Sequence, residues 1–310
     1  MTYKILQIDG GGIRGIIPSV ICAAIEERKG EPISRLFDMI SGTSTGAILG
    51  GALAAGIPAA RVRDLYLAEG PALFNPRFFL NPKRWTEGKY DRGKFRERFG
   101  TVIGDVNIGE VLTRYVATTF NLSSGRTHFV NSVDPKDAGY RLLDVISWSA
   151  LSAANYFGKI NAPEFAWDHY APDGTVDATR TGATFQDGGQ GINNCTLNND
   201  MSEVLARDHD DVLILSLGCG SSDLYVPYEK TSKKGFVAQV FAYFSQARNE
   251  STINQVLAAK YVEKHRPGIR TFRLDAFIPA KMDRLDAVKY ADEFRRVGES
   301  LVPRVPFDLL

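Results

Sequence analysis

A pentapeptide, Gly42-Thr43-Ser44-Thr45-Gly46, constrains the fold of this chain more than any other stretch. It lies between an apolar run at residues 36–40 and a run of small residues at 47–56. A serine flanked by glycines two positions away on each side, where a strand passes into a helix, indicates a turn too tight for side chains at the flanking positions. Such a turn presents the serine hydroxyl at the end of a sheet. We therefore predict that Ser44 is a nucleophile, while a glycine-rich turn without chemistry remains the alternative.

A second glycine-rich turn precedes this one. Residues 3–8 are apolar enough for a strand, and they lead into Asp9-Gly10-Gly11-Gly12-Ile13-Arg14-Gly15 and then into a helical pattern from Ile17 to Ile25. A strand, a glycine loop and a helix in this order are typical of the start of a parallel α/β sheet. Written as Gly10-x-Gly12-x-x-Gly15, the loop also matches the dinucleotide-binding fingerprint.

The dinucleotide interpretation requires an acidic residue at the end of the second strand, where it binds a ribose hydroxyl. That strand instead ends in Ser41 and Gly42, and the nearest acidic residue, Asp38, lies inside it. We therefore favour a nest of consecutive peptide N–H groups that binds an anion at the start of a helix. Beside a serine nucleophile, that anion is the oxyanion of a tetrahedral intermediate.

A serine hydroxyl needs a base to take its proton. None of the four histidines follows the end of an expected strand: His128, His169, His209 and His265. Asp187 does follow one, expected at 183–186, and Gly188 and Gly189 after it permit a sharp turn. We predict that the Asp187 carboxylate lies at the same edge of the sheet as Ser44 and acts as the base. An Asp-Gly turn without chemistry is the alternative.

Composition excludes some classes of function. The chain has 310 residues with 37 basic and 36 acidic side chains, so no global charge selects nucleic acid or an anionic surface. Its three cysteines are too few for a disulfide framework and too scattered for a zinc site, and we expect a reducing compartment. The N-terminus lacks the basic and apolar regions of a signal peptide, so we expect a cytoplasmic protein.

No repeat or linker divides the chain, so we predict a single domain over residues 1–310, with a motif-bearing core at about 3–220. A candidate cap or lid occupies 71–100, and residues 221–310 complete the α/β core. The cap segment mixes basic residues with aromatic ones, and long excursions of this kind are usually functional or disordered. We expect either a packed cap or a surface from Arg77 to Lys94 that contacts a membrane peripherally. The aromatic residues of the cap segment include Phe74, Phe78, Phe79, Trp85 and Tyr90.

Periodicity predicts the remaining elements. We expect helices at 45–55, 59–69, 108–120, 146–154, 237–262 and 285–301. Further strands are expected at 128–133, 140–145, 211–217 and 269–274, with a loop over 155–181.

Taken together, the three motifs resemble the signature of the patatin-like phospholipase family. That signature is an Asp-Gly-Gly-Gly-x-Arg-Gly loop, a Gly-x-Ser-x-Gly elbow and a later Asp-Gly-Gly or Asp-Gly-Ala. The chain is also similar to the family at 148–157, 191–195 and 211–220, so the resemblance covers about residues 3–220. It departs at Asn155 and Cys195, where proline is common, and at Cys219, where threonine is common.

The resemblance implies a three-layer α/β/α fold around a mostly parallel sheet, with no metal or other cofactor. It implies that Ser44 is the nucleophile, that Asp187 is the base, and that the peptide N–H groups of Gly11 and Gly12, with their neighbours Gly10 and Arg14, form the oxyanion hole. The expected activity is hydrolysis of a phospholipid or other acyl ester through an acyl-serine. Two alternatives stay open: a carboxylesterase or thioesterase acting on soluble esters, and a non-catalytic lipid-binding module.

Overall fold

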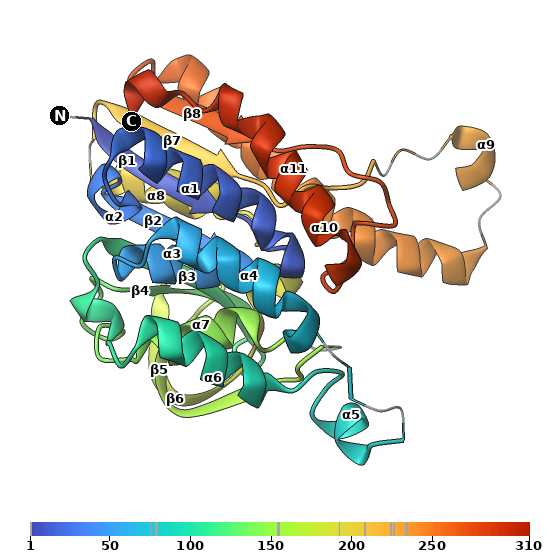
Figure 1. Cartoon of the computed structure of the whole chain (residues 1–310). Coiled ribbons are helices and arrows are strands. Elements are labelled where there is room, and N and C mark those ends of the chain that lie inside the picture. Colours follow the sequence, from blue (N-terminus) through green and yellow to red (C-terminus); the bar gives the residue numbers. More distant parts are fainter. Residues whose placement is uncertain are drawn as a thin grey trace.

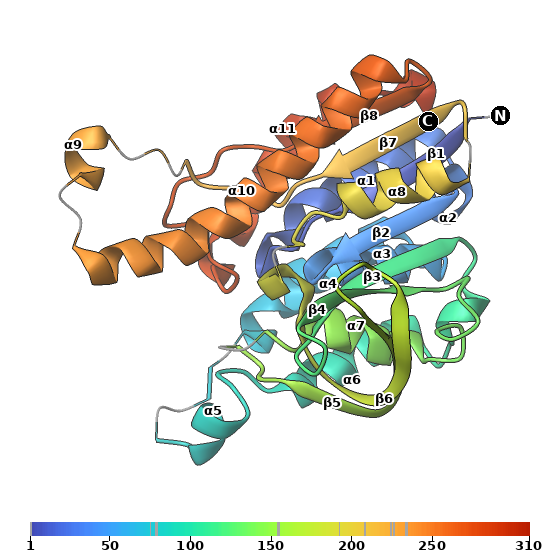
Figure 2. The same ribbon diagram turned by 180° about the vertical axis from the view of Figure 1, so that it is seen from behind.

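The computed structural model describes residues 2–74, 76–77, 80–153, 156–191, 193–207, 209–223, 225, 227–232 and 235–310. Three residues named above, Phe78, Phe79 and Asn155, lie outside the described residues, as does the side chain of Trp85. The described strands form one sheet that crosses the molecule, with helices on both of its faces (Figures 1 and 2). The expected α/β/α architecture is confirmed.

The centre of the sheet is parallel. In spatial order its strands are β3 (Arg114–Asn121), β2 (Met39–Thr43), β1 (Tyr3–Ile8), β7 (Val212–Leu217) and β8 (Ile269–Leu274). Each neighbouring pair among them is parallel. β2 and β7 are buried along their whole length, because helices cover both faces of the sheet. The carboxyl ends of all these strands therefore meet at a single edge, the carboxyl edge.

Antiparallel strands extend the sheet beyond β3. β4 (Arg126–Asn131) and β6 (Val176–Asp187) pair with β3, and β5 (Ile160–Tyr170) pairs with β6. The loop predicted at 155–181 is therefore wrong for most of its length, because it forms the β5–β6 hairpin. This hairpin buries widely spaced apolar residues on one face and leaves the other exposed, so it lacks a strong hydrophobic pattern.

Two more predicted elements are wrong. The helix expected at 108–120 is a short 3-10 turn, Ile108–Glu110, followed by β3, and the strand expected at 140–145 lies mostly in helix α7 (Leu142–Ala150). A strand buried on both faces loses the alternation of apolar and polar residues, so its apolar spacing can mimic a helix. The strands at 211–217 and 269–274 and the helices at 45–55, 59–69 and 237–262 are confirmed within a few residues at their ends. The strand expected at 36–40 was placed too early: Leu36 ends helix α2 and β2 spans Met39–Thr43, so Asp38 precedes the strand and Ser41 and Gly42 lie within it.

Helices α8 (Leu197–Ala206) and α10 (Phe236–His265) cover one face of the sheet (Figure 2). The longer helices of the other face are α1 (Ile16–Lys29), α3 (Thr45–Ala54), α4 (Ala59–Leu73), α6 (Arg92–Ile103), α7 and α11 (Ala291–Leu301). Short helices connect these elements: α2 (Ile33–Leu36), α5 (Pro82–Thr86) and α9 (Tyr228–Thr231). Among the helices described, none has both the length and the apolar character needed to cross a bilayer.

A buried carboxyl group joins α8 to the strand that leads into the serine turn. Asp200 of α8 accepts hydrogen bonds from the hydroxyls of Ser41, at 2.9 Å, and Thr196, at 3.3 Å. Its other oxygen, Oδ1, has no hydrogen-bond partner within the described part of the chain. Burial raises the pKa of Asp200 to about 7, although these hydrogen bonds oppose the rise. The folded protein therefore favours the protonated carboxyl group.

This preference makes stability depend on pH. The folded state keeps a proton that the unfolded chain loses near pH 4, so the free energy of unfolding falls between about pH 4 and about pH 7 and then levels off. Asp200→Asn should remove this loss. We expect it to stabilise the protein by a few kcal/mol at about pH 8, at about 1.4 kcal/mol per pKa unit, and by much less at about pH 5. Urea unfolding at the two pH values measures the difference.

The control is Asp105→Asn, at a side chain that is 79% exposed. It should have nearly the same small effect at both pH values. If Asp200→Asn also changed stability equally at both, Asp200 would not be the source of the pH dependence.

Candidate active site

Ser44 occupies a strained turn between β2 and α3, at the carboxyl edge of the sheet. Its backbone has φ 55° and ψ −120°, and it is the only residue other than glycine with positive φ among those described. A residue with a Cβ adopts such a conformation only when its surroundings hold it there. One such restraint is a hydrogen bond of 3.0 Å from the Ser44 peptide N–H to the hydroxyl of Ser149, in α7.

Close backbone contacts explain the glycines around Ser44. A Cβ on Gly46 would lie 2.2 Å from the carbonyl oxygen of Ile8, and a Cβ on Gly42 would lie 2.4 Å from the carbonyl group of Gly46. Backbone atoms at these distances cannot move aside as a flexible side chain would. The turn therefore packs directly on the end of β1, where the glycine loop begins. Thr43 completes the packing by donating a hydrogen bond of 2.8 Å to the carbonyl of Asn193.

The glycine loop between β1 and α1 is held by hydrogen bonds on one side. Gly10 donates its N–H to the carbonyl of Asn194 at 3.2 Å, and the Asn194 amide donates to the Gly10 carbonyl at 3.1 Å. The N–H of Arg14 donates to the Gly11 carbonyl at 3.3 Å. Between Gly10 and Arg14, in the structure as described, only the N–H groups of Gly11 and Gly12 have no acceptor.

The side chain of Arg14 fixes the loop from the same side. Its Nε donates to the carbonyl of Gly11 at 3.2 Å, and its Nη1 lies 2.6 Å from the carboxylate of Asp283. In a trans peptide the C=O group and the following N–H point in opposite directions. Because the Gly11 carbonyl faces Arg14, the Gly12 N–H points away from Arg14. By the same argument the Gly11 N–H points away from Asn194.

The base of the loop is held by a buried ion pair. Arg273 of β8 contacts both carboxylate oxygens of Asp9, at 2.9 and 2.5 Å, and Gln7 donates to the same carboxylate at 3.0 Å. Burial opposes the charge of Arg273, but the carboxylates of Asp9 and Asp275 raise the pKa of its guanidinium above the ordinary value. This ion pair connects the start of the glycine loop to β8 and so orients the loop.

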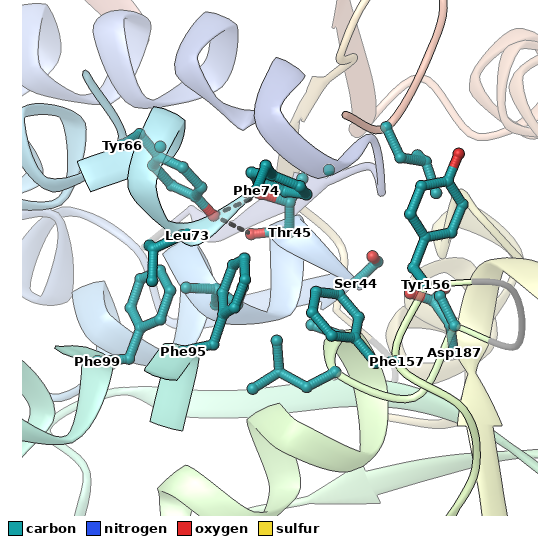
Figure 3. Close-up of a pocket in the computed structure, with 17 residues that line it drawn as sticks. Ser44, Thr45, Tyr66, Leu73, Phe74, Phe95, Phe99, Tyr156, Phe157 and Asp187 are labelled. Carbon is teal, nitrogen blue, oxygen red and sulfur yellow. Dashed lines mark hydrogen bonds between the residues drawn. The ribbon is translucent and has the colours of Figure 1, made fainter. Parts of the chain in front are cut away.

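Asp187 reaches the carboxyl edge from an antiparallel strand. It ends β6 in register with Thr119 of β3 and is 5% exposed. The following turn is tight: the Gly189 N–H donates to Asp187 Oδ1 at 2.8 Å, and a Cβ on Gly188 would lie 2.7 Å from the Thr118 carbonyl oxygen. Asp187 and Ser44 line the same cavity, and Figure 3 shows them next to each other at one end of it. None of the four histidines lines this cavity.

The cavity beside Ser44 is apolar. Gly12 lines it, whereas Arg14 and Asn194 line a separate polar cavity. Its walls come from α4, α6 and the chain after α7, and Figure 3 shows Phe157 beside Ser44, with Phe95 and Phe99 farther from it. The main wall residues are Tyr66, Leu73, Phe74, Phe95, Phe99, Leu151, Tyr156 and Phe157.

The sequence profile of the patatin-like phospholipase family matches residues 6–200. The chain belongs to the patatin-like phospholipase family. It is 34% identical over 132 residues to a cGAMP-activated phospholipase from Pseudomonas aeruginosa, which covers 41% of this chain and 39% of that protein. It is 28% identical over 271 residues to Patatin-like protein 1 of Arabidopsis thaliana, which covers 76% of this chain and 64% of that protein.

Patatin-like protein 1 of Oryza sativa subsp. indica is 31% identical over 257 residues, 70% of this chain and 58% of that protein. The match thus spans 39% to 64% of the length of these three relatives. Among solved structures, VipD from Legionella pneumophila covers 97% of this chain and 67% of its own, with 12% sequence identity and a TM-score of 0.42.

In this patatin-like chain, the segment predicted as a cap is partly built into the core. Phe95 and Phe99 of α6 are buried, and the Phe95 and Phe157 rings pack edge to face with centroids 4.9 Å apart. Its cations are largely engaged inside the protein. Arg77 pairs with Glu87 at 3.1 Å and Lys89 with Asp286 at 2.6 Å. Arg92 donates to the carbonyls of Leu151, Phe157, Gly158 and Lys159.

Sequence reasoning did not assign roles to two residues that position the patatin-like site, Ser149 and Asn194. Each acts through a hydrogen bond to another chain segment, which local patterning does not reveal. The sequence contained only an indirect indication of their importance: both residues lie in stretches that resemble the family, 148–157 and 191–195.

The contact between the serine turn and β1 is tested by adding a single Cβ. Gly46→Ala places a methyl group 2.2 Å from the Ile8 oxygen, so we expect a loss of about 3 kcal/mol or more in the free energy of unfolding. Gly50→Ala in the same helix is the matched control, because its Cβ meets only side-chain atoms, with Ile40 Cγ2 nearest at 3.0 Å. Alanine also favours the helix, so this control should stay within about 1 kcal/mol of wild type. Thermal and urea unfolding of both variants measure the difference, and equal stability would contradict the packing described.

Proposed function

We propose that the protein is a lipid acyl hydrolase that works through an acyl-serine intermediate. The Ser44 hydroxyl oxygen attacks the ester carbonyl of a phospholipid or related acyl ester, and its proton passes to the carboxylate of Asp187. The peptide N–H groups of Gly11 and Gly12 stabilise the oxyanion that forms. The observation that carries this proposal is that a strained serine, a buried carboxylate and Gly12 line one apolar cavity. Membership of the patatin-like phospholipase family supports it.

Formation of the acyl-serine and its hydrolysis use the same two side chains, Ser44 and Asp187. When the tetrahedral intermediate collapses, the ester C–O bond breaks, and the leaving alkoxide takes the proton from Asp187 to depart as a lysolipid or alcohol. Water then attacks the acyl-serine, giving its proton to Asp187, and the carbon–Oγ bond breaks to release the fatty acid. The proton on Asp187 returns to the Ser44 oxygen, which regenerates both groups.

A carboxylate is a weak base in water, because the pKa of a free aspartic acid is about 3.9. An Asp base therefore needs direct contact with the serine hydroxyl and little competing water. The burial of Asp187 and the apolar walls support these conditions.

Gly10 and Arg14 take supporting parts in this proposal. Because their own N–H groups are already donated within the protein, we assign them to holding the loop and assign the oxyanion contacts to Gly11 and Gly12. The elbow residues Gly42, Thr43, Thr45 and Gly46, and Gly188 and Gly189 after the base, shape the turns that present Ser44 and Asp187.

A soluble ester or thioester is the alternative substrate, and a non-catalytic lipid-binding module is the alternative function. Product analysis on mixed phospholipids and on short-chain esters and thioesters separates the first from the proposal. A fluorophosphonate probe separates the second, because a non-catalytic module leaves Ser44 unlabelled.

Removing either member of the dyad should abolish turnover. Ser44→Ala eliminates the nucleophile, and Asp187→Asn keeps the side-chain shape but removes the base, so each should lower kcat by about 1,000-fold or more. Ser44→Ala should also prevent fluorophosphonate labelling, whereas Asp187→Asn should slow it. Ser300→Ala, on α11, is the control and should be labelled at the wild-type rate. A folded Ser44→Ala protein with wild-type esterase activity would refute the assignment.

The proposed acyl site predicts a change in chain-length preference. Phe95→Leu opens space in the cavity wall, so we expect the ratio of kcat/KM for long over short acyl esters to change by about tenfold. Phe294→Leu, at an equally buried ring in α11 that does not line the cavity, should leave the ratio unchanged. Labelling of Ser44 by a small phosphonate should proceed in both variants. An unchanged ratio in Phe95→Leu would place the acyl chain elsewhere.

A further inference from the structure

Four large apolar side chains stand out by their exposure to solvent. Phe277 is 81% exposed, Tyr225 and Tyr228 are each 77% exposed, and Leu80 is 74% exposed, the highest values for large hydrophobic residues in the described chain. Scattered exposed apolar residues are normal on soluble proteins, but exposed aromatic residues grouped around a cavity indicate an interaction surface.

All four belong to segments at the carboxyl edge of the sheet. Tyr225 and Tyr228 follow β7, and Phe277 follows β8. Both strands run parallel to β1 and β2, so they end at the edge where Ser44 lies. Phe277 also pairs with Ser221, which lines the polar cavity beside the glycine loop.

Leu80 reaches the same region from another part of the chain. It lies two residues before α5, in the connection that follows α4, and Leu73 and Phe74, where that connection begins, line the apolar cavity. Figures 1 and 2 show α5, and α9 with Tyr228, extending beyond the body of the molecule on the same side. The exposed residues therefore come from three separate segments and surround one end of the molecule.

We propose that Leu80, Tyr225, Tyr228 and Phe277 form a rim that inserts into a lipid surface and brings the Ser44 cavity to its substrate. This proposal rests on the proposed function, because a rim that binds lipid serves an enzyme whose substrate is a lipid. Aromatic rings and leucine suit this partner, since they bury apolar area at the boundary of headgroups and acyl chains. A flat lipid surface can contact three separate projections at once.

Insertion of apolar side chains, rather than attraction to anionic lipid, is the main source of binding in this proposal. The expected basic surface from Arg77 to Lys94 has Arg77, Lys89 and Arg92 engaged with protein groups. Exposed cations such as Lys83, 66% exposed, make a smaller contribution. Binding to zwitterionic vesicles should therefore be substantial and should depend weakly on salt.

The test measures vesicle binding separately from catalysis. Every variant is made in Ser44→Ala protein, and its partition onto phosphatidylcholine vesicles is measured by flotation. Phe277→Ser, Tyr228→Ser and Leu80→Ser should each weaken partition by about tenfold, and the Phe277→Ser/Tyr228→Ser double variant by about 100-fold. Adding anionic phosphatidylglycerol, or raising the salt, should change partition by less than about threefold.

The matched control is Leu112→Ser. Leu112 is 70% exposed but lies just before β3, at the opposite edge of the sheet, so its loss should leave partition unchanged. In protein that retains Ser44, the rim variants should lose hydrolysis of vesicle phospholipid by the same factors while keeping their rate on a soluble short-chain ester. The retained rate on the soluble ester shows that the rim variants remain folded.

Three results would overturn the rim: no binding of the parent protein to vesicles, equal losses from Leu112→Ser, or binding that requires anionic lipid and is removed by Lys83→Ala. Failure of the hydrolase assignment gives a different pattern. Ser44 would then resist the fluorophosphonate probe while the rim variants still lost vesicle binding, because flotation does not depend on turnover.

Discussion

The contact between Gly46 and the carbonyl oxygen of Ile8 is the constraint on which the site depends. It presses the start of α3 against the end of β1, and the chain after Ile8 is the glycine loop. A Cβ on Gly10 would lie only 3.0 Å from the Cβ of Ser44, so loop and serine are adjacent because the backbones leave no room between them. Proximity of this kind needs no flexible side chain to maintain it.

The buried charges around the loop act on its orientation more than on stability. The free energy needed to remove two charges from water offsets much of their attraction. The Asp9–Arg273 and Arg14–Asp283 pairs are therefore expected to add little net stability. Their geometric effect is larger. Arg14 engages the Gly11 carbonyl and Asn194 engages the Gly10 carbonyl, and planar trans peptides then direct the next two N–H groups to the opposite side.

Where a prediction rested on a local backbone requirement, it agreed with the structure. The strand β1 before the glycine loop and the fully buried strand β7 could be predicted directly, because each follows from short-range geometry or a continuous apolar run. The β5–β6 hairpin and β3 could not. β3 is covered on both faces and β5 on one. Their patterns of apolar and polar residues therefore depend on which elements pack against them in the fold, and they do not show the simple alternation that indicates a strand.

Residue types and their spacing were enough to indicate a tight serine turn after β2, a glycine loop between β1 and a helix, and an acid before two glycines, because the requirements for glycine are local. Only the tertiary structure decided how they meet. Asp187 arrives on an antiparallel strand set by its register with Thr119, not at the end of a parallel one. The side of the glycine loop that faces Ser44 depends on Arg14 and Asn194, whose partners lie far along the chain. Likewise, the exposed rim forms only because three distant segments end at one edge of the sheet.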